Sequence, residues 1–412
     1  MTAFLLDALA LLLRWLHVVA AIAWIGESFY FVMLDRGLKA PKHGPDGVSG
    51  EMWSVHGGGF YHKQKYLLAP AAMPDELHWS KWKSYTTWLS GFALFTLTYL
   101  AAPAIQLVDP SVRQLTAQQA VLLALAFPVV AWFAYDVLCR IVGFRDGVLG
   151  IAVAVLVLAL DYAATQLFQG RAAFLLVGAA LGTIMSANVF FVIIPGQKRM
   201  VAALARGEQP DPLPGKRGKQ RSVHNTYFTL PVVFAMLSNH YAAAFAHEQR
   251  WLVLALFMAA GALIRQFFVL WHSGGRAFHL LAAGAVLLGV AFAWLAPKGS
   301  DASVEAAHGR ESSTQQRAND ASPSITDAAP VTTAQVLAIT QKHCIQCHSA
   351  HPTLMASAPK GTMFDSEAQV DALAPLIQQQ VVVLKIMPPG NLTQLGDDER
   401  AAIGRWFAAK SQ

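Results

Sequence analysis

Charged residues are scarce in this chain. Asp, Glu, Lys and Arg make up 14% of its 412 residues, whereas globular proteins contain about a quarter. This composition excludes an ordinary water-soluble domain for most of the chain. Apolar residues make up 55%, and runs long enough to cross a bilayer recur. We therefore predict an all-α fold that begins with an eight-helix transmembrane bundle, with helices near 8–34, 84–105, 119–138, 147–168, 172–194, 226–246, 251–270 and 277–296.

Cysteine is rarer still, with three residues in the whole chain. Two of them belong to the pentapeptide Cys344-Ile345-Gln346-Cys347-His348. C-x-x-C-H is the signature of c-type haem attachment, in which both thiols bond the vinyl groups and the histidine becomes the proximal ligand. A zinc site would need a second ligand pair, and Cys139 lies far away in a hydrophobic segment. A disulfide redox motif would not require the histidine. The pattern predicts one covalent haem c.

A second haem ligand is expected some forty residues downstream. Met387 begins the rigid stretch Met-Pro-Pro-Gly, which can hold a thioether over the far face of the porphyrin as the other axial ligand of the haem iron. Met355 and Met363 are rival candidates without a comparable turn. Two helices are expected around these ligands, 334–343 and 397–410, the second packing through Ile403, Trp406 and Phe407. These features predict a small helical, class I-like cytochrome c domain at 331–412.

Large apolar residues are almost absent from 298–330. This segment is rich in Ser, Ala, Asp, Gln and Pro and cannot bury enough surface to fold, so we predict a flexible linker. The predicted organisation is thus a transmembrane domain at 1–297, the linker, and the cytochrome c domain at 331–412.

The net charge of +6 is concentrated in two loops. Loops 35–83 and 196–225 each carry seven Lys or Arg residues, whereas the alternate short loops carry only Arg113, Arg171 and Arg250. By the positive-inside rule both basic loops face the cytoplasm and both termini lie outside. In a bacterial inner membrane, the cytochrome would then face the periplasm, where c-type haem is attached. This distribution argues against a nucleic-acid partner and for a lipid bilayer.

Loop 35–83 is long for a connector and concentrates histidines and aromatic rings. His56, His62 and Lys63 flank a triple glycine that permits an unusual turn or a close approach to a ligand. They are the first candidates for catalytic residues. The alternative is an ordinary basic loop that sets orientation, whose Trp79, Trp82 and Trp88 belong to a membrane belt.

Ionisable groups inside the helices are costly and point to function or to pairing within the bundle. His17, near mid-membrane, and Glu27 are the next candidates for a catalytic role, although a hydrogen-bonded core histidine is an equal alternative to a haem ligand. Asp136, Asp161 and Arg265 lie nearer helix ends, where mutual pairing or snorkelling explains them. The remaining polar residues predicted within helices are Asn188 and His240.

The chain resembles a known family in several segments. These are the first helix from Arg14-Trp15-Leu16-His17 through Ala23-Trp24-Ile25-Gly26-Glu27, His56-Gly-Gly-Gly-Phe-Tyr, and Leu77-His78-Trp79-Ser80-Lys81-Trp82. Joined to a tethered C-x-x-C-H domain, they resemble the membrane-bound, cytochrome c-linked urate oxidases (urate hydroxylases) of bacteria. The first helix also resembles, more distantly, that of small membrane protoporphyrinogen oxidases. There a helix histidine serves a b-type haem, so an additional b-type haem in the membrane domain is a further expectation.

The resemblance implies a purine-degrading oxidoreductase. It would convert urate and water to 5-hydroxyisourate and pass two electrons to the fused haem, then to a respiratory cytochrome oxidase or a soluble cytochrome c, without releasing peroxide. The loop histidines would face the cytoplasm, some 30 Å of hydrocarbon from the haem. Either urate binds deep between the helices, or a second cofactor relays electrons. The alternatives are a quinol–cytochrome c oxidoreductase, a non-catalytic electron conduit and a transporter.

Overall fold

A computed structural model describes residues 2–42, 47–67, 70, 73–296, 331–355 and 358–410 of the chain. The described chain is mostly helical, as predicted, and it divides into two compact units, residues 1–289 and 290–412. The predicted linker at 298–330 lies outside the described residues. The three domain boundaries drawn from the sequence therefore stay predictions.

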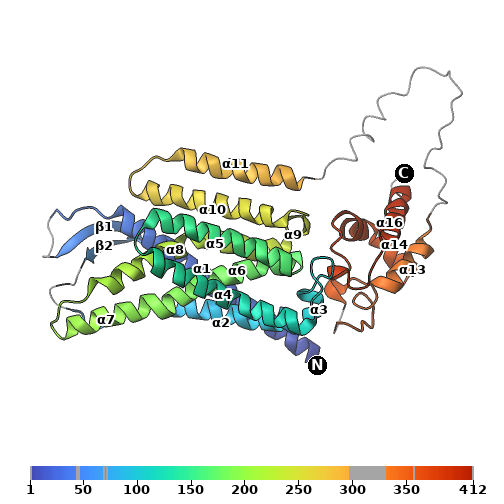
Figure 1. Ribbon diagram of the computed structural model, residues 1–412, viewed down its shortest axis with the longest axis horizontal. Helices are drawn as coiled ribbons and strands as arrows, with labels where there is room; N and C mark the ends of the chain where they lie inside the picture. The colour runs from blue at the N-terminus through green and yellow to red at the C-terminus, as the bar shows by residue number, and fades with distance from the viewer. Residues whose placement is uncertain are drawn as a thin grey trace, which may run out of the picture. The chain divides into compact units, whose positions relative to one another are not determined.

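The chain up to residue 296 contains helices of very different lengths and one β-hairpin (Figure 1). In chain order the elements are α1 (Thr2–Gly37), β1 (Val48–His56), β2 (Gly59–Tyr66), α2 (Trp82–Phe95), the π-helix η1 (Thr96–Leu100), α3 (Pro103–Gln106), α4 (Ala117–Val142), α5 (Asp146–Leu167), α6 (Gly170–Ala187), the π-helix η2 (Asn188–Ile193), α7 (Ile194–Ala205), α8 (Pro212–Leu237), the 3₁₀-helix η3 (Ser238–His240), α9 (Ala242–Ala246), α10 (Arg250–His272) and α11 (Phe278–Leu295).

Six helical runs in the described residues are long and apolar enough to cross a membrane. They are Phe4–Gly37, Ala117–Val142, Asp146–Leu167, Gly170–Ala205, Arg250–His272 and Phe278–Leu295. The chain is therefore a multi-pass membrane protein. The two other predicted spans, 84–105 and 226–246, fall on shorter or more polar helices. Helix α2 has 14 residues before η1 begins, and α8 starts at Pro212 with a polar first half and ends at Leu237.

Helix α6 lies at the centre of the membrane unit. It packs against α4, α5, α8 and α2, and most of its residues are buried. Small residues allow these close approaches: a Cβ at Gly178 would lie 3.0 Å from the Cβ of Ala235 on α8. Helix α1, by contrast, contacts mainly α2 and exposes most of its apolar side chains. Exposed apolar side chains of this kind suit a lipid surround.

The hairpin β1–β2 departs from the predicted all-helical fold. Its strands pair antiparallel, with His56 opposite Gly59 and Met52 opposite Lys63. Gly57 and Gly58 form the two-residue turn with φ of 58° and 81°, a conformation that favours glycine. The triple glycine thus makes an unusual turn, as the sequence indicated, and the aromatic and β-branched residues around it suit strands.

The two basic segments lie at the same end of the helices. Figure 1 shows the hairpin and α7 at one end of the membrane unit, and the N-terminus, α3 and α9 at the opposite end. The segment 196–225, predicted as a loop, is largely helical, since α7 continues to Ala205 and α8 begins at Pro212. His240, placed within a helical span from the sequence, lies in the 3₁₀-helix η3.

The C-terminal unit is a small helical fold. Its elements from residue 331 on are α13 (Thr333–His343), the 3₁₀-helix η4 (Pro359–Gly361), α14 (Glu367–Ala372), α15 (Ala374–Ile377), the π-helix η5 (Gln378–Val383), the 3₁₀-helix η6 (Pro389–Asn391) and α16 (Asp397–Lys410). The two helices predicted here are confirmed to within one residue. Ile403 and Trp406 of α16 are buried in the core with Val336 of α13, and Phe407 packs against that core.

Candidate functional site

The Cys-x-x-Cys-His pentapeptide forms the turn that follows α13. The amides of Cys347 and His348 both donate to the carbonyl of Cys344, at 3.1 and 2.8 Å. The Nδ1–H of the His348 ring donates to the carbonyl of Thr362 at 3.0 Å, because a carbonyl can only accept. This bond leaves Nε2 with its lone pair, and it fixes the orientation of the ring as ligand histidines require.

The two thiols remain protonated near neutral pH. Burial, together with the nearby Cys347, raises the pKa of the Cys344 thiol to about 12, and burial also raises that of Cys347. Both cysteines are free of disulfide bonds. Within the described residues no three His, Cys, Asp or Glu side chains are grouped to hold a metal ion. The residues present fit covalent attachment of a haem.

Met387 lies in a loop that α16 holds in place. The side chains of Met387 and Cys344 are both partly buried and both pack against the core of the C-terminal unit. The buried Arg400 guanidinium donates to the Met387 carbonyl at 2.9 Å and to the Val381 carbonyl at 2.5 Å. Met355 is exposed. Met387 thus lies in an anchored loop, and its role as the second ligand stays a prediction.

The hairpin separates the first candidates for catalysis. The Nε2–H of His62 donates to the Glu51 carboxylate at 2.9 Å, and the His62 ring stacks on Trp53 with 4.2 Å between the ring centroids. Lys63 contacts Ser54 and lies over the Tyr30 ring at 5.3 Å. Because neighbouring residues of a strand point to opposite faces, His62 and Lys63 do not converge. His56 is exposed beside the turn.

His17 and Glu27 both link α1 to the α2 region. The Nδ1 of His17 lies 2.9 Å from the Thr87 carbonyl, and a Cβ at Gly91 would lie only 2.8 Å from the imidazole. Glu27 forms an ion pair with Lys83 at 2.7 Å and also accepts from Ser80. Both contacts join α1 to the α2 region. For His17, this arrangement corresponds to the alternative of a hydrogen-bonded core histidine.

A buried polar network joins α4, η2 and α8. Asp136 pairs with Arg140 and Arg221, each at 2.6 Å, so its partners are not the Asp161 or Arg265 considered from the sequence. Asn188, the first residue of η2, is within this network, donating to Asn225 at 2.9 Å and to Tyr135 at 3.3 Å.

Asp161 and Arg265 have other surroundings. Neither carboxylate oxygen of the buried Asp161 has a hydrogen-bond partner, and the Arg265 guanidinium lies over the Phe29 ring at 4.4 Å. These two residues therefore do not pair with each other in the described chain.

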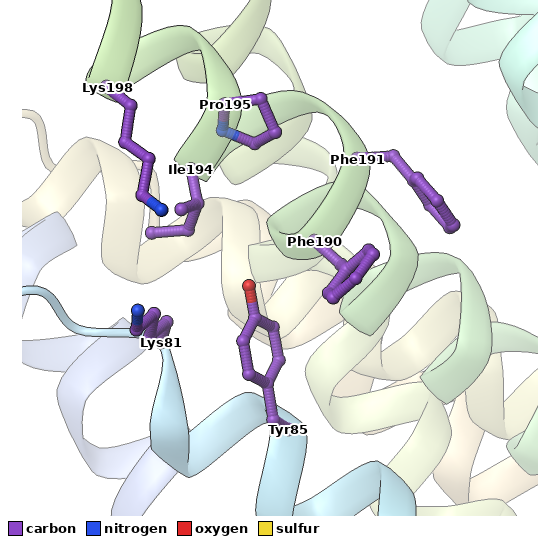
Figure 2. A pocket seen from close by; sticks show the side chains of 7 residues that line it. All are labelled: Lys81, Tyr85, Phe190, Phe191, Ile194, Pro195 and Lys198. Carbon is purple, nitrogen blue, oxygen red and sulfur yellow. The ribbon is translucent and has the colours of Figure 1, made fainter.

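A pocket of about 500 Å³ opens between α2 and the η2–α7 segment (Figure 2). Its lining combines two lysines with three aromatic rings and two aliphatic residues, namely Lys81, Tyr85, Phe190, Phe191, Ile194, Pro195 and Lys198. The Lys81 and Lys198 ammonium groups and the Tyr85 hydroxyl point into the same gap. Tyr85, the two phenylalanines and Lys198 were not among the site residues predicted from the sequence. The signal that the sequence did contain is Pro195, which directly follows the apolar run 172–194.

Fold and geometry together define a multi-pass membrane protein whose small helical C-terminal unit carries a Cys-x-x-Cys-His turn. The family model described as "Urate oxidase N-terminal" matches residues 3–296, well over half of the chain, so the chain belongs to this family. No match was found among curated proteins or solved structures. Membership indicates an oxidoreductase that acts on urate. The match ends at residue 296 and does not include the Cys-x-x-Cys-His turn.

Proposed function

We propose that this protein oxidises urate to 5-hydroxyisourate in purine degradation. Urate and one water would give 5-hydroxyisourate, two protons and two electrons. The observation that carries the proposal is the family match over residues 3–296. Because the electrons leave through the protein, oxygen is not the direct acceptor and no peroxide is formed.

The C-terminal unit is the proposed electron outlet. Cys344 and Cys347 would hold a haem c covalently, with His348 and Met387 on its iron, and the haem would supply one-electron transfer at a potential raised by His/Met ligation. The His348–Thr362 hydrogen bond, which leaves Nε2 available, supports this role. The acceptor beyond it would be a respiratory cytochrome oxidase or a soluble cytochrome c.

The proposed location is a bacterial inner membrane. Eight spans would cross it, with α2 plus η1 and the apolar half of α8 added to the six long helices. Both termini and the cytochrome would face the periplasm, since both basic segments lie at one end of the bundle. A reporter fused after residue 412 should be active only outside the cytoplasm, and cytoplasmic activity would contradict this topology.

The decisive experiment adds urate to the purified full-length protein under anaerobic conditions. We expect c-type haem absorption bands that shift to the reduced form, with one urate consumed for every two electrons counted by titration with an external oxidant. A quinol analogue is the matched comparison. Reduction of the haem by the quinol but not by urate would support the quinol–cytochrome c oxidoreductase instead. If neither compound reduces the haem, the alternative that remains is a non-catalytic electron conduit.

A further inference from the structure

Lys81 and Lys198, at the pocket, form no ion pair with an acidic residue in the part of the chain that the structure describes. Lys83, two residues from Lys81, is paired with Glu27 at 2.7 Å, and Lys65 of the hairpin is paired with Asp35 at 2.6 Å. In the described residues no carboxylate lies within 4 Å of the ammonium group of Lys81 or Lys198, and none lines the pocket. The two ammonium groups are thus not ion-paired, although that of Lys81 lies over the Trp82 ring at 5.6 Å.

Lys81 of the pocket lining is also the N-cap of α2. The helix begins at Trp82, and the Lys81 side chain does not cap it, while the Glu27 carboxylate contacts Ser80 and Lys83 at this helix start. The amides of a first helical turn carry a positive partial charge, and they favour an anion nearby. Lys198 approaches from α7, so the two charges come from separate elements.

Aromatic rings supply flat walls beside these charges. Tyr85 meets Phe190 edge to face at 5.4 Å, and Phe190 meets Phe191 at 4.8 Å. The volume of about 500 Å³ lies within the range of roughly 300–1,000 Å³ usual for small-molecule sites. The rings meet at 62° and 80°, so a planar anion can lie against the face of one of them while the edges of the others border it.

The local chain fold explains why the pocket exists. Pro195 has no N–H to donate to the carbonyl of residue 191, so the α-helical pattern cannot continue through this turn. The chain instead adopts the π-helix η2, whose wider turn carries Phe190 and Phe191 into the lining. Single π-helical turns occur often at functional sites. On its other side η2 is anchored by the buried Asn188.

We propose that this pocket is the binding site for the urate anion. Lys81 and Lys198 neutralise its charge, the Tyr85 hydroxyl hydrogen-bonds its edge, and the ring walls contact its plane. The assignment rests on the proposed function, because the pocket alone defines only a planar aromatic anion. It moves the candidate site from the hairpin to the junction of α2 with η2 and α7.

The test measures urate binding to the full-length protein in nanodiscs without an electron acceptor. Lys81→Gln and Lys198→Gln should each weaken binding at least tenfold, about 1.4 kcal/mol or more, as expected for loss of a charge-assisted contact. Tyr85→Phe keeps the ring and should weaken binding less. In steady-state reduction the lysine variants should raise KM more than they lower kcat. Haem content and elution volume report on folding.

Two matched controls carry the same substitution elsewhere. Lys219→Gln removes an exposed lysine of the same basic end, outside the pocket lining, and should leave binding unchanged. Lys63→Gln tests the hairpin, where the ammonium already contacts Ser54 and the Tyr30 ring. A tenfold loss at Lys63 with none at Lys81 and Lys198 would place the site at the hairpin and overturn the proposal.

The remaining outcomes separate this proposal from the function itself. If wild type binds urate and both pocket variants bind it equally well, the pocket is not the site. Loss of co-purified anionic phospholipid in those variants, with urate affinity unchanged, would identify a lipid site instead. If wild type binds urate through both lysines but its haem is not reduced, the binding site stands and urate oxidation fails. A wild type that does not bind urate contradicts both.

Discussion

The two units of the chain hold their functional polar groups in opposite ways. In the C-terminal unit His348 is fixed by Thr362, and the Met387 loop is fixed by Arg400. In the membrane unit Lys81 and Lys198 point into a pocket without an acidic partner among the described residues. The residues proposed to hold a resident haem are thus fixed by hydrogen bonds, whereas the lysines proposed to bind a substrate are not ion-paired among the described residues.

The largest effect should come from removing the fixed proximal ligand. His348→Ala deletes the imidazole whose Nε2 would bind the haem iron, and we expect urate-dependent electron output to be abolished. The measurement is reduction of an external cytochrome c by urate. His351→Ala removes an exposed histidine three residues away and should keep the activity. If His348→Ala reduces the external cytochrome c at the wild-type rate, His348 is not a required ligand. The contrast drawn between the two units would then fail for the C-terminal unit.

The second ligand should matter for potential rather than for attachment. Met387→Ala leaves both thiols in place, so we expect covalent haem to persist while its reduction potential falls. Potentiometric titration of the full-length protein measures this shift. Met355→Ala removes an exposed methionine and should not change the potential. An unchanged potential in the Met387 variant would show that another residue is the axial ligand.

A smaller effect is expected from loosening the Met387 loop. Arg400→Met removes the donors to the carbonyls of Met387 and Val381, and an unpaired buried group costs about 1–3 kcal/mol. We expect a lower denaturant midpoint, with unfolding monitored by haem absorption. We also expect a reduction potential between those of wild type and Met387→Ala. Arg405→Met, on the exposed face of α16, is the control. If Arg400→Met keeps the wild-type stability and reduction potential, the Met387 loop does not depend on Arg400.

The smallest effect should be a pH dependence confined to the C-terminal unit. The Gly396 amide, Lys342 and His343 lower the pKa of Glu399 from 4.5 to about 2. A lowered folded-state pKa adds stability above about pH 4.5, and that stability is lost as the pH falls toward 2. Thermal unfolding at pH 5.5 and pH 3 should therefore differ more in wild type than in Glu399→Gln. The exposed neighbour Asp398→Asn should keep the wild-type difference.

Sequence and structure agree best where the determining residues are close in the chain. The helix before Cys344 and the amphipathic α16 follow from local patterns, and both form at the expected positions. The pairing of Asp136 with Arg221 joins residues 85 apart, so no local pattern contains it. The pocket likewise draws on Lys81 and Lys198 from different helices, and its shape depends on a π-helical turn. The hairpin was missed because its strands, of nine and eight residues, lie in a segment whose basic residues and histidines led to its assignment as a loop.

The pocket takes one lysine from each basic segment, 35–83 and 196–225, and this has an electrical consequence. With the proposed topology, in which the basic end faces the cytoplasm and the haem lies outside, each oxidised urate would send two electrons outward through the bilayer. The cytoplasm of a respiring cell is electrically negative, so this movement would run down the membrane potential. Full crossing releases about 2.3 kcal/mol per electron for every 100 mV. Under this proposal the transmembrane voltage would drive urate oxidation forward, and each turnover would partly discharge it.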